Sequence, residues 1–342
     1  MLSLKKSDAL KRNLRDLINE KQLKLKNLRP ISPVALQKLK ERFQIEMTYN
    51  SNGIEGNTLT LNETYWVFQE GITVRGKSLK EHLEVKDHKK ALDRLYQMIE
   101  SPTDLDFSER LVKELHRAVI ELSEEANDDD YRNTDVLISG SDHKTPVPGD
   151  IAKAMKALVT WVRNTPQLHP VEFAALLHHQ FVHIHPFLDG NGRTARLLMN
   201  LFLMRAGFPL VIILKNDRQK YYRALRMADR GRYRALIQLI AQAVIRSLNL
   251  YLDTLTPSQE KDNLISLTEA TKYCNYSQEY LSKLAKEGRL DAHKMKRNWV
   301  TTKKAIEEYV AKHGQGKRPS NSIFKVTKTF VRNLEDPMKH ES

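Results

Sequence analysis

Cysteine, glycine, proline and long apolar runs are all scarce in this chain of 342 residues. The single cysteine, Cys274, excludes an internal disulfide and a cysteine metal cluster, and it favours a reducing, cytoplasmic setting. With 13 glycines and 12 prolines the chain is neither collagen-like nor a low-complexity polymer. No apolar run approaches the roughly 20 residues that a membrane span needs, and the first residues lack the apolar core of a signal peptide. We therefore expect a soluble globular protein without membrane contact.

Positive charge is abundant, but it is confined to the two ends of the chain. The net charge is +14. Residues 1–45 hold 12 Lys and Arg against 4 Asp and Glu, and residues 257–342 hold 17 against 11, whereas residues 46–256 hold 27 of each. The basic character thus belongs to two appendages on a neutral block, where it serves either an anionic partner or solubility alone.

Hydrophobic periodicity predicts a mainly α-helical protein. Leu39, Phe43 and Met47 recur at helical spacing and predict a helix from about residue 34 to 51, ending in the turn residues 50–53. A basic helical pattern precedes it within residues 1–30. Further helices are expected at 62–71, 78–100, 107–122, 149–164, 170–184, 191–206, 216–229 and 232–254.

Two segments depart from this pattern. Residues 136–140 are short and β-rich, and the prolines that follow at 146 and 148 indicate a hairpin or flap with proline-bounded edges. Residues 264–313 predict a small separate domain. In it Ser266 opens a short helix, Gly288 stops a second helix, two short strands follow, and a last helix runs to about residue 312. The tail from 314 is basic and polar.

The densest chemistry lies in the segment His-Pro-Phe-Leu-Asp-Gly-Asn-Gly-Arg-Thr-Ala-Arg, residues 185–196. His185 ends one helix, and it is the group suited to act as a general base near neutral pH. The glycines before the next helix let its backbone N–H groups face an anion. Arg193 and Arg196, three residues apart, share a helix face and can clamp phosphate oxygens, while Asp189 offers one carboxylate to Mg²⁺. These parts together indicate phosphoryl or nucleotidyl transfer.

This segment resembles the signature of the Fic family, H-x-F-x-D/E-G-N-G-R-x-x-R, at every fixed position. The similarity extends over about residues 100–255. The resemblance implies transfer of AMP from ATP to a Tyr, Ser or Thr hydroxyl of a target protein, with release of pyrophosphate. It makes His185 the catalytic base and Asp189 the Mg²⁺ ligand. Gly192, where relatives of other activity depart from the pattern, matches the AMP-transferring form.

The resemblance also assigns the rest of the site. A flap that aligns the target segment by strand addition would comprise Val136, Leu137, Ile138 and Ser139. The ATP-binding set would comprise Glu55, Val182, Phe187, Leu188, Asp189, Gly190, Asn191, Gly192, Arg193, Arg196 and Tyr222.

A second motif lies upstream, at residues 51–57, and resembles the inhibitory motif S/T-x-x-x-E-G/N of the same family. There the glutamate projects from a helix and pairs with the second motif arginine, so that ATP binds in a non-productive pose. On its own so short a pattern is more often a helix end with a surface glutamate, but the downstream motif favours the inhibitory interpretation. We expect Ser51 and Glu55 to act in this way on Arg196.

Residues 264–313 resemble the small winged helix-turn-helix of excisionase-like and MerR-like proteins. In such a module a basic helix and wing meet DNA phosphates, although the same module can recruit a protein or pack on the core. The basic residues concerned are Lys283, Lys286, Arg289, Lys294, Lys296 and Arg297.

The expected architecture is mainly α. It comprises an N-terminal helical region (1–99) with the inhibitory helix, a Fic core with one β-hairpin flap (100–255), a winged helix-turn-helix (264–313) and a basic tail (314–342). The leading hypothesis is a Mg²⁺-dependent protein adenylyltransferase that acts on ATP and a target protein, which could be the chain itself. Hydrolytic removal of AMP at the same site, or a DNA-binding regulator whose core senses nucleotide, are the alternatives.

Two further points concern histidines and assembly. A zinc site made of His178, His179, His183 and His185 is not favoured, because glutamates at the spacing of zinc proteases are absent. The sequence leaves open whether the chain forms a homodimer.

Overall fold

The computed structural model describes residues 9–28, 30–101, 106–124, 130–138, 143–164, 168–256, 264–295 and 298–315. The chain divides into two compact units. The larger comprises residues 1–261 with 293–297, and the smaller comprises residues 262–292 and 298–342.

The larger unit is built from helices, which confirms the predicted mainly α class. A π-helical turn, η1 (Trp66–Glu70), and a 3₁₀ turn, η2 (Lys215–Asp217), interrupt the series. The α-helices are α1 (Arg12–Asn27), α2 (Pro33–Glu55), α3 (Leu61–Tyr65), α4 (Leu79–Glu100), α5 (Glu109–Ile120), α6 (Pro148–Asn164), α7 (Pro170–Ile184), α8 (Asn191–Arg205), α9 (Arg218–Asp229) and α10 (Arg234–Leu255).

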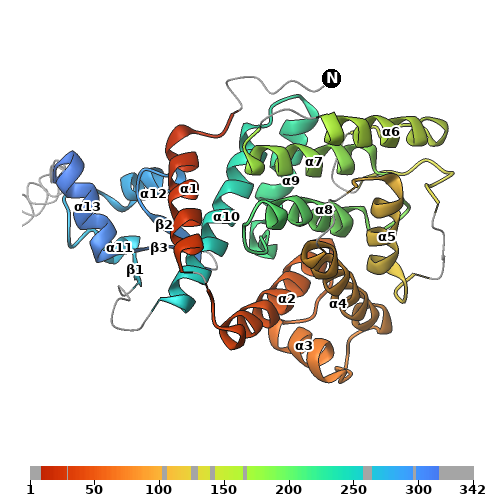
Figure 1. The fold of residues 1–342 in the computed structure, drawn as a ribbon, viewed down its shortest axis with the longest axis horizontal. Coiled ribbons are helices and arrows are strands. Elements are labelled where there is room, and N and C mark those ends of the chain that lie inside the picture. Colours follow the sequence, from red (N-terminus) through yellow and green to blue (C-terminus); the bar gives the residue numbers. More distant parts are fainter. Residues whose placement is uncertain are drawn as a thin grey trace, which may run out of the picture. The chain divides into compact units, whose positions relative to one another are not determined.

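The pair α7 and α8 lies at the centre of this unit (Figure 1). α7 begins with a capping box, in which His169 and Glu172 satisfy each other's backbone N–H groups, and Pro170 follows at the first helical position. Its residues Ala175 and Phe181 are fully buried. α6, α9 and α10 pack on α7, whereas α4 and α5 pack on α8. The loop between the two central helices is therefore held from several sides.

α10 is long and apolar enough to cross a membrane by length and composition alone. However, 61% of its most apolar window is buried inside the protein. Its buried residues Ile237, Ile240, Val244 and Leu248 recur at helical spacing, and the helix packs on α1, α7 and α9. These contacts identify it as a core helix of this unit.

The end of α2 differs from the prediction. The helix does not stop at residues 50–53 but continues to Glu55 and ends at Gly56, whose φ is 116°. The polar residues stay helical because their side chains find partners. Asn50 Nδ2 donates to Glu46 O at 2.8 Å, and Asn52 Nδ2 donates to Glu84 O at 3.1 Å. Glu55 is therefore carried by a regular helix.

The β-hairpin expected around residues 136–148 is not a strand pair in the described part of the chain. Residues 136–138 and 143–147 belong to no strand, and Ser139 lies outside the described residues. Pro146 and Pro148 cannot donate to a ladder. The described residues on either side of 139–142 are irregular, and the Arg132 side chain binds the backbone carbonyls of Thr134 and Pro146, as described below.

The smaller unit has the order of elements predicted for residues 264–313. β1 pairs antiparallel with β3, Ile265 opposite Thr301, and the sheet order is β1-β3-β2. Ser266 and Thr302 cap the helices that follow them. Whether this unit works as a winged helix-turn-helix stays a prediction. The elements of residues 264–313 are β1 (Leu264–Ser266), α11 (Leu267–Ala270), α12 (Gln278–Lys286), β2 (Ala292–Met295), β3 (Asn298–Thr302) and α13 (Lys303–His313), of which residues 293–295 of β2 are grouped with the larger unit.

Candidate active site

His185 ends α7 in a strained backbone conformation. Its φ of 51° lies in the left-handed region, and among the described residues it is the single non-glycine with a positive φ. Its N–H donates to Phe181 O at 3.0 Å, which closes the helix, and its Nδ1 lies 3.3 Å from Val182 O. Because a carbonyl only accepts hydrogen bonds, Nδ1 carries the proton and Nε2 keeps the lone pair. The imidazole therefore presents a basic nitrogen.

Burial lowers the pKa of His185 below its ordinary value. The positive charge of Arg132 lowers it further, whereas the carboxylates of Glu55 and Asp189 oppose the change. A histidine with a lowered pKa is neutral at neutral pH, and this is the form that a general base needs.

Arg132 binds the flap to this loop. Its buried guanidinium donates to three carbonyls, His185 O at 2.8 Å and Thr134 O and Pro146 O at 2.7 Å each. Its backbone N–H donates to Pro186 O at 2.9 Å. The sequence did not predict a role for Arg132. A single arginine after an acidic loop belongs to no recognisable motif, and two of its carbonyl partners, His185 O and Pro146 O, lie far from it in the sequence.

Phe187 and Asn191 shape the loop from inside. Asn191 bridges it, since its Oδ1 accepts from Phe187 N at 3.0 Å and its Nδ2 donates to Phe187 O at 2.7 Å. The buried phenyl ring stacks on His116 with ring centroids 3.5 Å apart, and His116 Nε2 donates to Asp189 O at 2.9 Å. Burial lowers the pKa of His116 to about 4, so it is neutral. The sequence did not predict that His116 supports this loop, because a single histidine on a buried helix face is usually a packed core residue.

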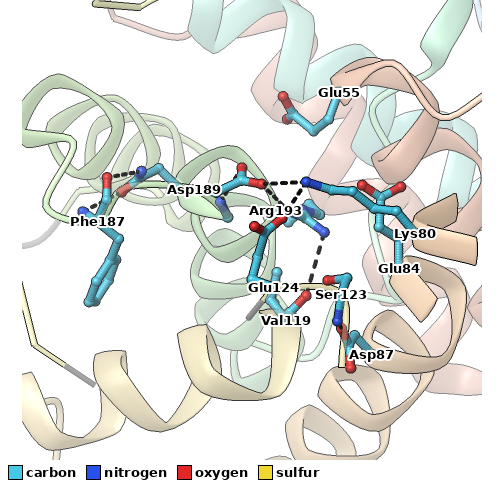
Figure 2. Close-up of polar contacts among 12 residues, drawn as sticks. Glu55, Lys80, Glu84, Asp87, Val119, Ser123, Glu124, Phe187, Asp189 and Arg193 are labelled. Carbon is cyan, nitrogen blue, oxygen red and sulfur yellow. Dashed lines mark hydrogen bonds and ion pairs between the residues drawn. The ribbon is translucent and has the colours of Figure 1, made fainter. Parts of the chain in front are cut away.

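Asp189 lies just before α8 with a half-exposed carboxylate. Oδ1 accepts from Gly190 N at 2.6 Å, and Oδ2 lies 3.2 Å from Arg193 Nη2 and 3.9 Å from Lys80 Nζ (Figure 2). Burial raises its pKa, but Arg193 and the Gly190 N–H outweigh this, so the pKa of Asp189 lies below its usual value. The carboxylate is ionised and accessible.

Arg193 is buried next to residues of α4 and of the end of α5. Beyond its pair with Asp189, its Nη1 lies 3.5 Å from Val119 O. Lys80 reaches from α4 toward Asp189 and pairs with Glu124 at 2.5 Å (Figure 2). Lys80 and Glu124 were not predicted, because nothing in their spacing relates them to the motif. They place a second cation and a second carboxylate beside Asp189.

Arg196 is fully buried and is bound by α2. Its Nε donates to Ser51 Oγ at 2.9 Å, and its Nη2 donates to Ser51 O at 3.0 Å and to Glu55 Oε1 at 2.7 Å. Burial lowers its pKa, but the Glu55 carboxylate outweighs that effect, and the guanidinium stays charged. Its Nη1 is buried without a hydrogen-bond partner. The structure thus brings together the three residues that the resemblance to the inhibitory motif joined.

Two glycines are required by this packing. Gly190 has a φ of 76°, and a Cβ there would lie 2.8 Å from Ile120 Cγ2. A Cβ on Gly192 would overlap Glu55 Oε1. Gly192 therefore leaves the space in which the Glu55 carboxylate lies above the first turn of α8.

A cavity of about 210 Å³ opens beside His185. This is smaller than the roughly 300–1,000 Å³ of ordinary ligand pockets, and the Glu55 side chain projects into its wall. The lining residues include Glu55, Leu137, Ile138, His143, Val182, His185, Gly192, Tyr221, Tyr222, Leu225, Arg226 and Asp229.

The other predicted site residues take different places. Val182 and Tyr222 line the cavity, and Tyr222 Oη lies 3.3 Å from Ile54 O. Leu188 is largely exposed on the loop. Leu137 is fully exposed on the flap, and Val136 is half-buried outside the cavity lining.

Known proteins are similar to this chain in sequence and fold. Residues 106–203 match the model of the Fic/DOC family. A protein of Nematostella vectensis named protein adenylyltransferase Fic is 40% identical over 260 residues, which is 74% of this chain and 59% of that protein. The crystal structure of a Fic domain containing signaling protein from Bacteroides thetaiotaomicron is 30% identical, covers 71% of this chain and 97% of that one, and has a TM-score of 0.65. For Fic-1 of C. elegans the values are 30%, 70%, 72% and 0.64.

The fold and the site define a helical protein whose candidate site lies at the loop between two central helices, α7 and α8. The chain belongs to the Fic family. It spans 59% of the length of the Nematostella relative.

Proposed function

We propose that this chain is a protein adenylyltransferase, which transfers AMP from ATP to a hydroxyl group of a target protein. The observation that carries the proposal is the position of a neutral His185, with Nε2 unprotonated, in a cavity that Gly192 of α8 also lines, while the buried Arg196 of the same helix binds Glu55 in the cavity wall. Base, anion cradle and cations are the parts that nucleotidyl transfer needs. The name of the Nematostella relative supports the same activity.

The reaction follows from these positions. His185 Nε2 accepts the proton of the target hydroxyl, and the oxygen forms a bond to the α-phosphorus of ATP. The bond from that phosphorus to the bridging oxygen breaks, and pyrophosphate leaves. Arg193 and Arg196 stabilise the charge on the phosphates, and the buried Nη1 of Arg196 offers a donor that still lacks a partner.

Asp189 fits a Mg²⁺ ion. Its carboxylate is ionised and half-exposed, and Mg²⁺ takes one or two carboxylates together with substrate phosphates. The bound ion would neutralise charge on the phosphates. Gly190 N–H and Arg193 hold the carboxylate in place for that role.

Glu55 restrains the proposed activity. Its carboxylate occupies Arg196 Nη2 and lies over Gly192, which is where a terminal phosphate of ATP would meet the arginine. ATP then binds without placing its α-phosphorus in line with the hydroxyl. We therefore expect a low resting activity as a consequence of this pair.

The test is transfer of label from ATP to protein by the full chain with Mg²⁺. Label on the α-phosphate should appear on protein weakly with the wild type and strongly with Glu55→Gly. Label on the γ-phosphate should not appear. Equal transfer from γ-labelled ATP would mean a kinase and would refute the proposal.

The reverse activity, hydrolytic removal of AMP, is the second candidate. It is favoured by one observation, that the partly exposed Glu55 carboxylate lines the same cavity as His185, where it can orient a water molecule. Release of AMP from a labelled, purified target tests it. Release by the wild type but not by Glu55→Gly would assign Glu55 this role.

The smaller unit is proposed to bind DNA. α12 carries Lys283 and Lys286 in its last turn, as a helix meeting phosphates would. Mobility shift of random duplex DNA at several salt concentrations tests this. A shift that is unchanged in the Lys283→Ala/Lys286→Ala double variant would contradict it.

A further inference from the structure

A cluster of two histidines and one aspartate borders the cavity but has no part in the proposed transfer. His183 is the last residue but one of α7, Asp229 is the last residue of α9, and His143 lies in the segment that precedes α6. One ligand atom from each can be chosen so that all three lie within 4.8 Å of one another. All three side chains are half-buried and line or adjoin one cavity. Three separate elements thus bring metal-ligating groups to one point.

The pairwise geometry is close to that of a metal site. His183 Nδ1 and Asp229 Oδ1 are 3.1 Å apart. Two ligands on a tetrahedral zinc ion, each about 2.1 Å from the metal, are about 3.4 Å apart. An ion can therefore replace the proton between these two atoms with a small shift of either side chain. His143 and His183 are stacked with ring centroids 3.8 Å apart, and because an imidazole binds a metal in its ring plane, the His143 ring must rotate out of this stack for Nδ1 to reach the ion.

The surrounding hydrogen bonds orient the ligands. His143 Nε2 donates to His183 O at 2.8 Å, so Nδ1 is the nitrogen that would bind the ion. Metal-ligating histidines usually donate their other N–H to a carbonyl or carboxylate in this way. The buried His179 donates Nε2 to Asp229 Oδ1 at 2.9 Å and fixes the carboxylate. These contacts are the supporting shell that metal sites need.

We propose that His143, His183 and Asp229 form a binding site for one divalent transition-metal ion such as Zn²⁺. Two imidazoles and one carboxylate suit zinc better than Mg²⁺, which prefers oxygen ligands. Three protein ligands leave a fourth position for water. The ion joins the segment 143–147 to α7 and α9 and so fastens one side of the flap beside the cavity. The site uses none of Asp189, Arg193 or Arg196, and it requires no transferase activity.

Asp229 Oδ1 accepts hydrogen bonds from two imidazoles, His179 Nε2 at 2.9 Å and His183 Nδ1 at 3.1 Å. The neighbouring histidine His178 is not part of this cluster. Its Nε2 lies 2.9 Å from Tyr221 Oη in the core.

The experiment is a calorimetric titration of the full, untagged, chelator-treated chain with Zn²⁺. We expect one ion per chain. His143→Ala should weaken binding at least about tenfold, because it removes one of three ligands from a segment outside any helix. Asp229→Asn should do the same, and His313→Ala, an exposed histidine of the smaller unit, should leave binding unchanged. Circular dichroism verifies that each variant is folded.

Two further measurements locate the ion. Amide hydrogen exchange of residues 143–147 should slow on adding Zn²⁺ in the wild type but not in His143→Ala. Co²⁺ should show the intense visible bands of four-coordination in the wild type only. Absence of stoichiometric binding would overturn the proposal. So would binding that survives both His143→Ala and Asp229→Asn but is lost in Asp189→Ala.

Discussion

The cavity beside His185 has two walls that are built in opposite ways. The helical wall consists of Glu55 and Gly192, backed by Arg196, and every part of it lies on a regular helix. The flap wall consists of Leu137, Ile138 and His143, and it has no regular backbone structure in the described residues. One wall is held by an ion pair between the buried Arg196 and the partly exposed Glu55, and the other wall is held by side-chain hydrogen bonds to carbonyls.

We expect the two walls to have different tasks: the helical wall controls the arginine that would bind phosphate, and the flap wall receives the target protein. A buried charge such as Arg196 must be compensated, because an unpaired buried charge is strongly destabilising. The helical wall therefore has two stable partners for the arginine, the Glu55 carboxylate and a phosphate, and can exchange one for the other. On the proposed function, we expect the flap wall to receive an extended target segment by backbone hydrogen bonding. Four changes would break or sharpen this comparison.

The largest effect should come from His185, which stands between the walls. In a Glu55→Gly background, His185→Ala should reduce labelling from α-labelled ATP by about 10²- to 10⁴-fold, because it removes the general base. Binding of ATP, measured by calorimetry, should stay within a few-fold. A variant that keeps its labelling rate would exclude His185 as the base.

Breaking the helical wall comes next. Glu55→Gly should raise labelling by about 10- to 100-fold, the usual range for release of a coupled inhibitory contact. Glu41→Gly, on the same helix but remote from Arg196, is the matched control for the cost of glycine in a helix. Equal activation by both substitutions would mean that loosening α2, rather than freeing Arg196, causes the effect.

Breaking the flap wall should act on stability first. Arg132→Ala removes three hydrogen bonds from a charged donor and should lower the free energy of unfolding by about 2–4 kcal/mol. Denaturant unfolding measures this. Activity should fall mainly through a higher KM for the target protein, since the flap is displaced while the phosphate site stays intact. A pure loss of ATP affinity would contradict the separation of the two walls.

The smallest effect concerns pH. The base must be unprotonated, so labelling should rise with pH through the pKa of His185 and level off above it. Because burial and Arg132 lower that pKa, the midpoint should lie below the ordinary histidine value. Glu55 raises the pKa, so Glu55→Gln and Glu55→Gly should both move the midpoint to lower pH. A midpoint that moves upward in either variant would contradict the assigned electrostatics.

The expectations made from the sequence were confirmed where local residues decide the structure and were wrong where remote partners decide it. The motif between His185 and Arg196 was readable because its residues are adjacent and its glycines and proline have local conformational reasons. The helices around it were placed within a few residues by hydrophobic period. The end of α2 and the hairpin were wrong, because partners remote in sequence decide both. Glu84 O supports Asn52, and Arg132 takes the carbonyls that a strand partner would have used.

The sequence by itself determined the helical class and the chemistry of the loop, because periodicity and the residues of one short segment carry that information. Only the tertiary structure decided that Arg132 joins the flap to His185, that Lys80 and Glu124 flank Asp189, and that His143 meets His183 and Asp229. These contacts join residues from distant parts of the chain. Their geometry depends on how the helices pack, and no local pattern encodes it.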